Sequence, residues 1–365
     1  RDKLVTGVQT CALPILNVYT MKSTFSLIIA LLIFSAAMGR SAGADYTKQY
    51  RKGWSKNGVT GIQISNKFGE VKINNMGGDS ITIKVLITID NASESKARDM
   101  MNRIKISLQK NGNTISGNTD IEDGFKGNNS FSIDYLINTP KDKNLDITNK
   151  YGNVVVNELD ANGSFDVSYG SMTAGKMRTP TGSPIRISVA YGKADLETIN
   201  SAEIDVKYSK LNADEITNLQ LTTKYSGINF HKVGQLNLDS KYDSYSIDEI
   251  SKLKSVSKYT NYKIDLLTGD FDLDTGYGSV RINKVDPKFG RIVINNSYGG
   301  ITIGMAGLNY TVDADCDYCD INYPENRYKG NKIRENHKFS LQGTVGSGGG
   351  KVNITSRYGG IKLEE

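Results

Sequence analysis

An aromatic residue recurs along most of this chain, and a glycine often follows it. The intervals between successive tyrosines from Tyr151 to Tyr298 are 17 to 22 residues. The recurring tyrosines are Tyr151, Tyr169, Tyr191, Tyr208, Tyr225, Tyr242, Tyr259, Tyr277, Tyr298 and, farther on, Tyr358. A period this short predicts a solenoid, in which each coil stacks on the coil before it. Counting Phe68 as a further member, and Cys316 as standing where an aromatic is expected, we predict about 12 coils.

The residues between two tyrosines favour short strands joined by corners. Around Tyr208, the apolar or small residues Leu211, Ala213 and Ile216 are separated by steps of two and three. Steps of two keep side chains on one face of a strand, and a step of three marks a corner. The fifth residue after the aromatic is apolar in coil after coil. The sequence therefore predicts an all-β fold, a single parallel β-solenoid (β-helix) whose coils lie about 4.8 Å apart.

The corner after each tyrosine sets the second expectation. Glycine at that position predicts a tight corner with positive φ, and the middle coils replace it with Ser209, Ser226, Asp243 or Thr260. In those coils we expect either a slightly relaxed corner or Asp and Ser side chains that form hydrogen bonds with their own backbone. We expect the tyrosines to point inward as a stacked ladder. Beside them, the Asn, Ser and Thr residues that stand two positions before eight of the aromatics should satisfy one another's hydrogen bonds.

The N-terminal residues fall outside the repeat. Residues 1–20 contain VTGVQTCALPI and are interpreted as an adapter-derived artefact. Residues 21–44 read as a signal peptide, because a lysine precedes an apolar run and small residues stand before Asp45. The run, Phe25–Met38, is shorter than the roughly 20 residues of a membrane-spanning helix. A retained N-terminal anchor is the alternative.

The other segments divide the chain further. Residues 45–146 are expected to hold the first coil and a capping element. Within that element we expect a short helix over Ser93–Arg103, opened by a capping box of Asn91 and Glu94, and a hairpin around Asn111. Residues 147–322 should form the regular solenoid, 323–350 an irregular loop insertion, and 351–365 a terminal coil.

Charge argues against nucleic acid as a partner. Without residues 1–44 the chain keeps 41 basic and 38 acidic residues, a net charge of about +3. Nucleic-acid-binding domains are usually strongly basic on one face. The abundance of Gly, Asn, Ser, Thr and Tyr suits an exported β-rich protein with no membrane span after processing.

A row of lysines is the first candidate site. Lys207, Lys224, Lys241 and Lys258 precede the tyrosine in four successive coils. Stacked about 4.8 Å apart, their charges would repel one another by just under about 1 kcal/mol in water. Such a row favours anions, for example an anionic glycan or envelope polymer. Lysines also keep β-surfaces soluble, and Asp205 and Asp239 partly neutralise the row.

Two cysteines and a group of acids are further candidates. Cys316 and Cys319 are expected to point inward, joined in a disulfide or left as two buried thiols, and no further zinc ligands accompany them. The carboxylates of Asp313, Asp315 and Asp317 would sit nearly 7 Å apart along a strand, which is too far to share one calcium ion. We therefore expect no metal and no cofactor.

The order of these segments resembles a known family. A strand, a helix, a hairpin, the segment YLINTP at 135–140, repeated Tyr-Gly units and the final NITSRYGGIKL are together similar to the bacterial putative-adhesin family, a β-strand-repeat family of unknown function. The resemblance covers residues 59 to 363. It implies an exported β-solenoid of the cell envelope and brings no catalytic residues.

The expected function is binding. We expect an exported, non-enzymatic, adhesin-like protein of the bacterial periplasm or cell surface that presents a repetitive surface. A polysaccharide-cleaving β-helix enzyme is one alternative, although the two histidines, His231 and His337, lie in different coils without a catalytic motif. The other is a regulatory or scaffold partner of an envelope protein.

Overall fold

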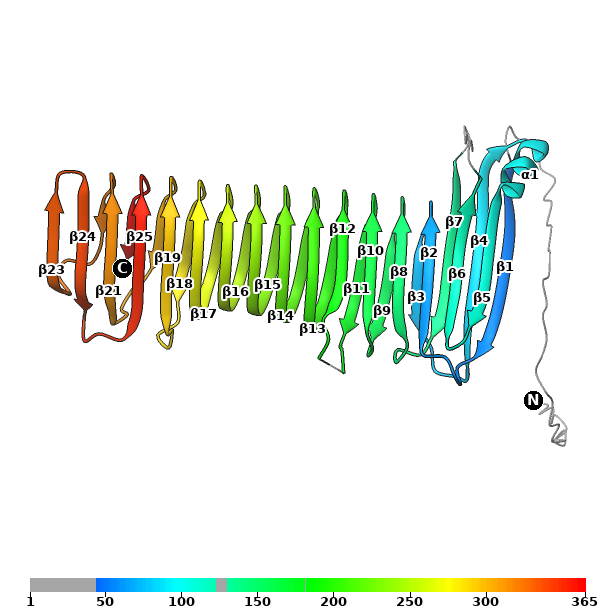
Figure 1. Cartoon of the computed structure of the whole chain (residues 1–365), viewed down its shortest axis with the longest axis horizontal. Helices are drawn as coiled ribbons and strands as arrows, with labels where there is room; N and C mark the ends of the chain where they lie inside the picture. Colours follow the sequence, from blue (N-terminus) through cyan, green and yellow to red (C-terminus); the bar gives the residue numbers. More distant parts are fainter. Residues whose placement is uncertain (1–43, 123–129, 181) are drawn as a thin grey trace, which may run out of the picture.

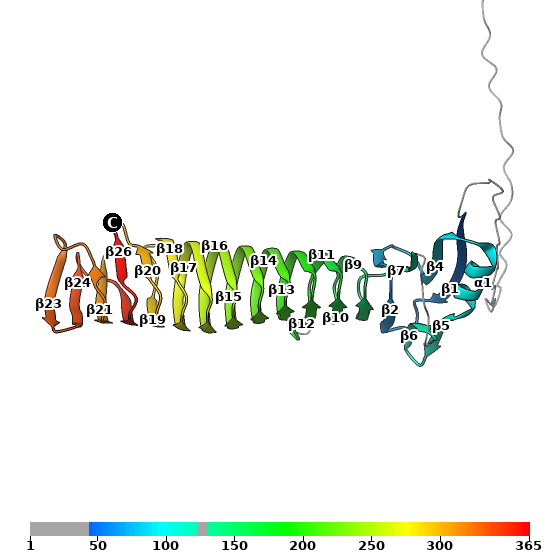
Figure 2. The same ribbon diagram turned by 90° about the horizontal axis from the view of Figure 1, so that it is seen from above.

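The computed structural model describes residues 44–365 apart from 123–129 and 181. The expected adapter-derived stretch, 1–20, and the expected signal peptide, 21–44, lie outside the described residues except for Ala44. The described strands stack along one long axis, with β1 at one end and β23 at the other (Figures 1 and 2). The prediction of an all-β solenoid is confirmed. Within the described part, no helix is long and apolar enough to cross a membrane.

Each coil is flattened into two layers of parallel strands. The first layer precedes the recurring tyrosine, and the second follows it. The separate strands of the first layer are β2 (Gly61–Lys67), β8 (Asn144–Lys150), β10 (Gly163–Ser168), β12 (Ile185–Ala190), β19 (Arg291–Ser297), β25 (Gly350–Arg357) and β21 (Tyr310–Asp317). Those of the second layer are β3 (Val71–Asn75), β9 (Val154–Leu159), β11 (Ser171–Met177), β18 (Val280–Val285), β20 (Ile301–Gly304), β26 (Ile361–Glu364) and β22 (Ile321–Asn322).

In the central coils a single long strand passes through both layers. These strands are β13 (Lys193–Lys207), β14 (Lys210–Lys224), β15 (Gly227–Lys241), β16 (Ser244–Lys258) and β17 (Asn261–Gly276). Strands β13 to β16 pair with a constant offset of one coil, so like residues lie over like, and β17 shifts its register by one residue after Leu267. In β14, the residues Leu211, Ala213, Ile216 and Leu219 are all buried. The core is therefore a continuous apolar column between the two layers.

Antiparallel strands and a helix are added to the N-terminal end of the stack. Strand β7 (Phe131–Thr139) runs parallel to β3, β4 (Ser80–Ala92) is antiparallel to β7, and β1 (Ala44–Ser55) is antiparallel to β4. The hairpin of β5 (Ile104–Asn111) and β6 (Thr114–Ile121) joins the first layer beside β2. The hairpin was predicted at this place.

Helix α1 (Glu94–Asn102) buries Ala97, Met100 and Met101 against these strands. Its N-cap residue is Ser93, whose side chain makes no capping hydrogen bond. The prediction placed Asn91 at this position, two residues too early, so the predicted capping box was wrong in its N-cap residue. The helix instead gains its stability from the packing of one apolar face, which is the usual case for a short helix.

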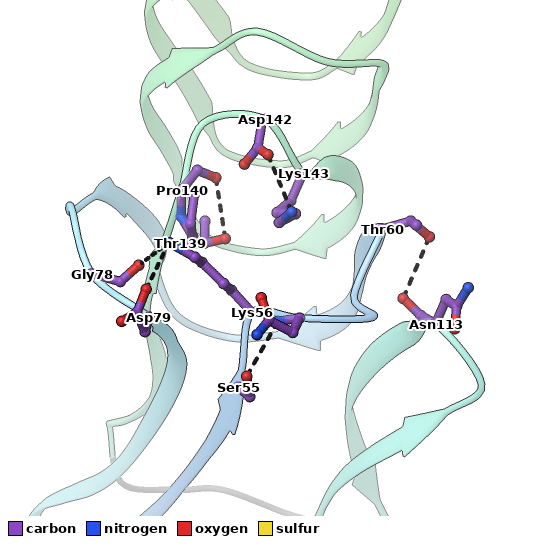
Figure 3. Close-up of polar contacts among 11 residues, drawn as sticks. Ser55, Lys56, Thr60, Gly78, Asp79, Asn113, Thr139, Pro140, Asp142 and Lys143 are labelled. Atoms are coloured by element: carbon purple, nitrogen blue, oxygen red, sulfur yellow. Dashed lines mark hydrogen bonds and ion pairs between the residues drawn. The ribbon is translucent and has the colours of Figure 1, made fainter.

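Polar contacts close the turns where this end meets the first coil (Figure 3). Lys56, just after β1, donates from Nζ to the carbonyl oxygen of Gly78 at 2.9 Å and pairs with Asp79 Oδ1 at 2.9 Å. The hydrogen bond from Lys56 Nζ to the Asp79 carboxylate lowers the pKa of that carboxyl group. The hydroxyl of Thr60 donates to the carbonyl oxygen of Asn113 in the hairpin turn at 3.4 Å.

The C-terminal end differs from the prediction in two ways. Residues 323–350, predicted as an irregular loop, contain the antiparallel strands β23 (Tyr328–Glu335) and β24 (Lys338–Val345). Strand β24 is antiparallel to β21, so the pair extends the first layer. The coil of residues 351–365, predicted as terminal, is not the end of the stack. Strand β25 lies between β19 and β21, and β26 lies between β20 and β22.

Candidate functional site

The recurring tyrosines form a ladder on the surface, and the prediction that they point inward was wrong. Their φ angles lie between 51° and 63°, in the left-handed region. These tyrosine residues are 42% to 50% exposed. A residue with positive φ at the corner directs its side chain away from the coil, whereas the strand residues before and after it alternate in and out. The prediction extended the in-and-out alternation of the strand to the tyrosine, but this alternation ends at the residue before it.

The glycine after each tyrosine has a different role from the one predicted. Its φ is not in the left-handed region, so it is not needed for chain direction. A Cβ atom at Gly152 would lie 1.9 Å from the carbonyl oxygen of Gly69, and one at Gly170 would lie 2.0 Å from that of Gly152. Glycine is required because the backbones of successive coils approach closely at this corner.

In the coils without this glycine, a buried polar side chain stabilises the corner. Ser209 Oγ donates to Lys207 O at 2.7 Å, and Ser226 Oγ donates to Lys224 O at 2.9 Å. Thr260 makes the same bond to the carbonyl two residues before it. The expectation that these side chains bond their own backbone agrees with this geometry.

The tyrosine rings stack on one another without interruption. Successive ring centroids are 4.6 to 5.0 Å apart from Tyr151 to Tyr298. The ladder then follows the stacking order rather than the sequence, from Tyr298 to Tyr358 at 4.9 Å and on to Tyr318 at 5.0 Å. Because each face covers the next, the exposed parts are the ring edges and the hydroxyl groups. Sequence reasoning missed Tyr318, which occupies the aromatic position assigned to Cys316.

Stacking should offset the strain of the left-handed backbone, and one position separates the two effects. Replacing Tyr225 by alanine is expected to lower the free energy of unfolding by about 1–2 kcal/mol, since two ring contacts are lost while the strained φ of 53° remains. Tyr225→Gly loses the same contacts but adopts this φ freely, so it should be about 1 kcal/mol more stable than the alanine variant. Urea unfolding of both variants measures the difference. Equal stabilities would show that the left-handed corner carries no cost.

The four predicted lysines lie in a row beside this ladder. Lys207, Lys224, Lys241 and Lys258 are direct register partners in β13 to β16, and all four side chains are exposed. The row is next to the tyrosines because each lysine is the last residue of its strand. Lys67 and Lys150 are paired in the same way nearer the N-terminal end.

The surroundings of the row are mixed in charge. Lys207 Nζ pairs with Asp205 Oδ2 at 3.0 Å, which neutralises one end of the row as expected. Lys224 Nζ lies 5.4 Å from the centroid of the Tyr225 ring, and Lys150 Nζ lies 5.0 Å from that of Tyr151. Similar cation–π contacts are worth about 0.5–1 kcal/mol at exposed sites. The tyrosine ladder and the lysine row thus form one continuous surface, which we call the ladder surface.

The two cysteines are joined in a disulfide, with their Cα atoms 5.3 Å apart. Cys316 is a register partner of Ser356, so it stands two positions before the aromatic rather than at the aromatic position. Cys316 is buried, and Cys319 is half-buried at the position where other coils have glycine. The disulfide spans a single corner near the C-terminal end.

The two histidines lie on the surface, and each is paired with a carboxylate. His231 Nδ1 lies 2.9 Å from Asp248 Oδ2, and the hydrogen bond to this carboxylate raises the pKa of His231. His337 stacks on Tyr318 at 4.1 Å and lies 3.2 Å from Asp317 Oδ1. His337 therefore extends the tyrosine ladder by one ring, which the spacing of the repeat did not indicate. Across the described chain, no three His, Cys, Asp or Glu side chains gather as a metal site.

A buried carboxylate lies in the core beneath the ladder surface. Asp243 is 4% exposed, and its Oδ2 accepts hydrogen bonds from Thr223 Oγ1 and Ser240 Oγ, both at 2.6 Å. The backbone N–H of Lys241 donates to the same oxygen at 2.9 Å, and that of Ser226 donates to Oδ1 at 2.7 Å. The polar residues two positions before the aromatic thus converge on a single acid here. Elsewhere they pair with one another, as Ser257 does with Thr275 at 2.9 Å.

No protein-family model and no curated protein matches the sequence. Solved structures do. One is a putative cell adhesion protein from Clostridium sporogenes, with 14% identity, 87% of this chain and 99% of that chain covered, and a TM-score of 0.19. Another is a putative adhesin from Parabacteroides merdae, with 11% identity, coverage of 87% and 96%, and a TM-score of 0.27.

A third is a putative lipid binding protein from Parabacteroides distasonis, with 14% identity, coverage of 69% and 95%, and a TM-score of 0.29. The adhesin names agree with the resemblance found in the sequence. At identities and TM-scores this low, function has to be decided from the residues of this chain.

Proposed function

We propose that this chain is an exported, non-enzymatic protein of the bacterial cell envelope that binds a linear anionic polymer along the ladder surface. The observation that carries the proposal is the in-register row of four lysines beside the tyrosine ladder. The strands that carry these lysines lie about 4.8 Å apart, so their like charges repel one another, although Asp205 pairs with Lys207. A polymer with regularly spaced anions relieves that repulsion while releasing counterions.

The ladder favours a carbohydrate over a nucleic acid as the polymer. Proteins that bind single-stranded nucleic acid stack its bases on free aromatic faces. Here each ring face is covered by the next tyrosine, at 4.8 Å for Tyr242 and Tyr259. What the ladder offers is a row of phenol hydroxyls and ring edges, which suits the hydroxyls and carboxylates of an acidic glycan. The antiparallel strands and helix at the N-terminal end are proposed to cap the stack.

The proposal predicts that the lysine row controls binding of an acidic glycan. Replacing all four lysines by glutamine should weaken binding of polygalacturonate by at least about tenfold at low salt, because four contacts between a lysine and a carboxylate are lost. The loss should shrink as salt is added, since charge contacts with a polyanion depend steeply on salt. Isothermal titration calorimetry at several salt concentrations measures the loss, and neutral dextran should bind neither protein.

A matched variant separates the site from overall charge. It replaces four exposed lysines of the second layer by glutamine, namely Lys176, Lys210, Lys232 and Lys263. This control has the same net charge and should bind polygalacturonate like the unmodified protein. Equal weakening in both variants, or none in either, would remove the ladder surface as the binding site.

A further inference from the structure

The two layers end at different heights at the C-terminal end of the stack. The first layer continues beyond β21 with β24 and β23. The second layer stops at β22, which has two residues and pairs only with β26 among the described strands. A place for one further strand therefore lies open beside β22, facing the inner side of the β23–β24 hairpin.

This open place contains a cavity of about 960 Å³, which we call the end notch. Its apolar lining includes Ile321, Tyr323 and Phe339, all of which are buried. Its charged lining comprises Asp320, Glu325, Lys332, Arg334 and Lys362. The volume falls in the range of ordinary ligand sites, which is about 300–1,000 Å³.

Two cations of the hairpin face the notch. Arg334 and Lys332 are the register partners of Phe339 and Leu341, both of which are buried. Directly opposed residues of an antiparallel pair share a face, so the two cations lie on the inner side of the sheet. Both are nevertheless exposed, because no strand of the second layer covers them.

A carboxylate of the chain itself occupies the edge of β22. Asp320 Oδ1 accepts a hydrogen bond from the backbone N–H of Ile321 at 2.9 Å and one from Arg334 Nη2 at 2.6 Å. On the other side of β22, the backbone N–H of Ile361 in β26 donates a hydrogen bond to the carbonyl oxygen of Asp320 at 2.9 Å. In a parallel ladder alternate residues bond to opposite sides, so the N–H of Ile321 faces the open side. Asp320 thus stands where the carbonyl of a further strand would be.

We propose that the end notch receives an extended acidic segment of a partner protein, added as a further strand beside β22. Its backbone takes over the hydrogen bond that Asp320 now accepts from Ile321, and one of its carboxylates replaces Asp320 on Arg334. Strand addition of this kind obtains affinity from main-chain bonds and selectivity from alternate side chains. Lys332 and Lys362 attract the same negative charge. This inference is independent of the ladder surface.

The test uses a fluorescein-labelled peptide of alternating valine and glutamate, titrated with the protein and followed by fluorescence anisotropy. Binding should be lost when lysine replaces glutamate in the peptide. It should also be lost when alternate backbone nitrogens are methylated, since a methylated nitrogen cannot donate to a strand. Arg334→Gln should weaken binding about tenfold, as for the loss of a charge-assisted bond. Lys329→Gln, on the outer side of β23, should leave it unchanged.

A gain of affinity distinguishes strand addition from simple charge attraction. Asp320→Ala removes the chain's own occupant, so it should tighten binding of the valine–glutamate peptide about tenfold. Glu325→Ala removes the same charge from the notch without opening the edge of β22 and should change affinity much less. Equal gains in both variants, or binding of the methylated peptide, would overturn the proposal. It would also be overturned if octanoate, a fatty-acid probe, displaced the peptide and itself remained bound. Circular dichroism of each variant checks that the fold is kept.

Discussion

Asp243→Ala is expected to lower the free energy of unfolding by about 4 kcal/mol, because it leaves two backbone N–H groups in the core without an acceptor. The N–H groups are those of Ser226 and Lys241, which donate to the two carboxylate oxygens. Each unsatisfied buried donor costs about 1–3 kcal/mol. The hydroxyls of Thr223 and Ser240 have second partners in Tyr245 and Thr260 and can adjust. The two N–H groups are fixed by the backbone and cannot.

The matched control is Asp239→Ala in the same coil. Asp239 is exposed on the outer side of the first layer, so its loss should change stability by no more than about 0.5 kcal/mol. Guanidinium unfolding followed by far-ultraviolet circular dichroism compares the variants, and hydrogen exchange locates the weakened coils, since solenoids can open coil by coil. A loss for Asp243→Ala as small as that for Asp239→Ala would mean that the buried carboxylate is not structural.

Gly299→Ala is expected to destabilise the C-terminal half of the stack by about 4 kcal/mol or more. A Cβ atom at this position would lie 1.7 Å from the carbonyl oxygen of Gly278 in the coil before it. That contact is with backbone, which cannot move aside like a flexible side chain. The two coils would have to separate at this corner and lose the hydrogen bonds that pair β20 with β18.

The neighbouring residue provides the control, because a Cβ atom at Gly300 meets nothing within 4 Å. Gly300→Ala should therefore be tolerated, with a change of no more than about 0.5–1 kcal/mol in either direction. Thermal unfolding and hydrogen exchange of both variants measure the contrast. If the two alanine variants unfold together, the close approach of successive corners does not limit this position.

Prediction from the sequence worked where it depended on the repeat and failed where it depended on geometry at one residue. The buried positions of β14, such as Leu211 and Ile216, follow from steps of two and three. The sequence pattern also placed the four lysines in one row. The same pattern could not show that Tyr225 has a φ of 53° and points outward, because side-chain spacing contains no information about a left-handed backbone. The role of glycine was missed for the same reason, since the carbonyl that approaches Gly152 belongs to Gly69, in a coil far away in the sequence.

The repeat of aromatic and apolar residues by itself determined the parallel stacking, because only a coil of constant length places like side chains over like. The tertiary structure alone decided the order of the last coils. The final strands, β25 and β26, fill a place between coils that precede them in the sequence. Any strand with the repeat's pattern fits beside any other, so local pattern cannot rank them. Their order is set by the β23–β24 hairpin, which pairs with β21, extends the first layer by two strands and leaves the second layer two strands shorter.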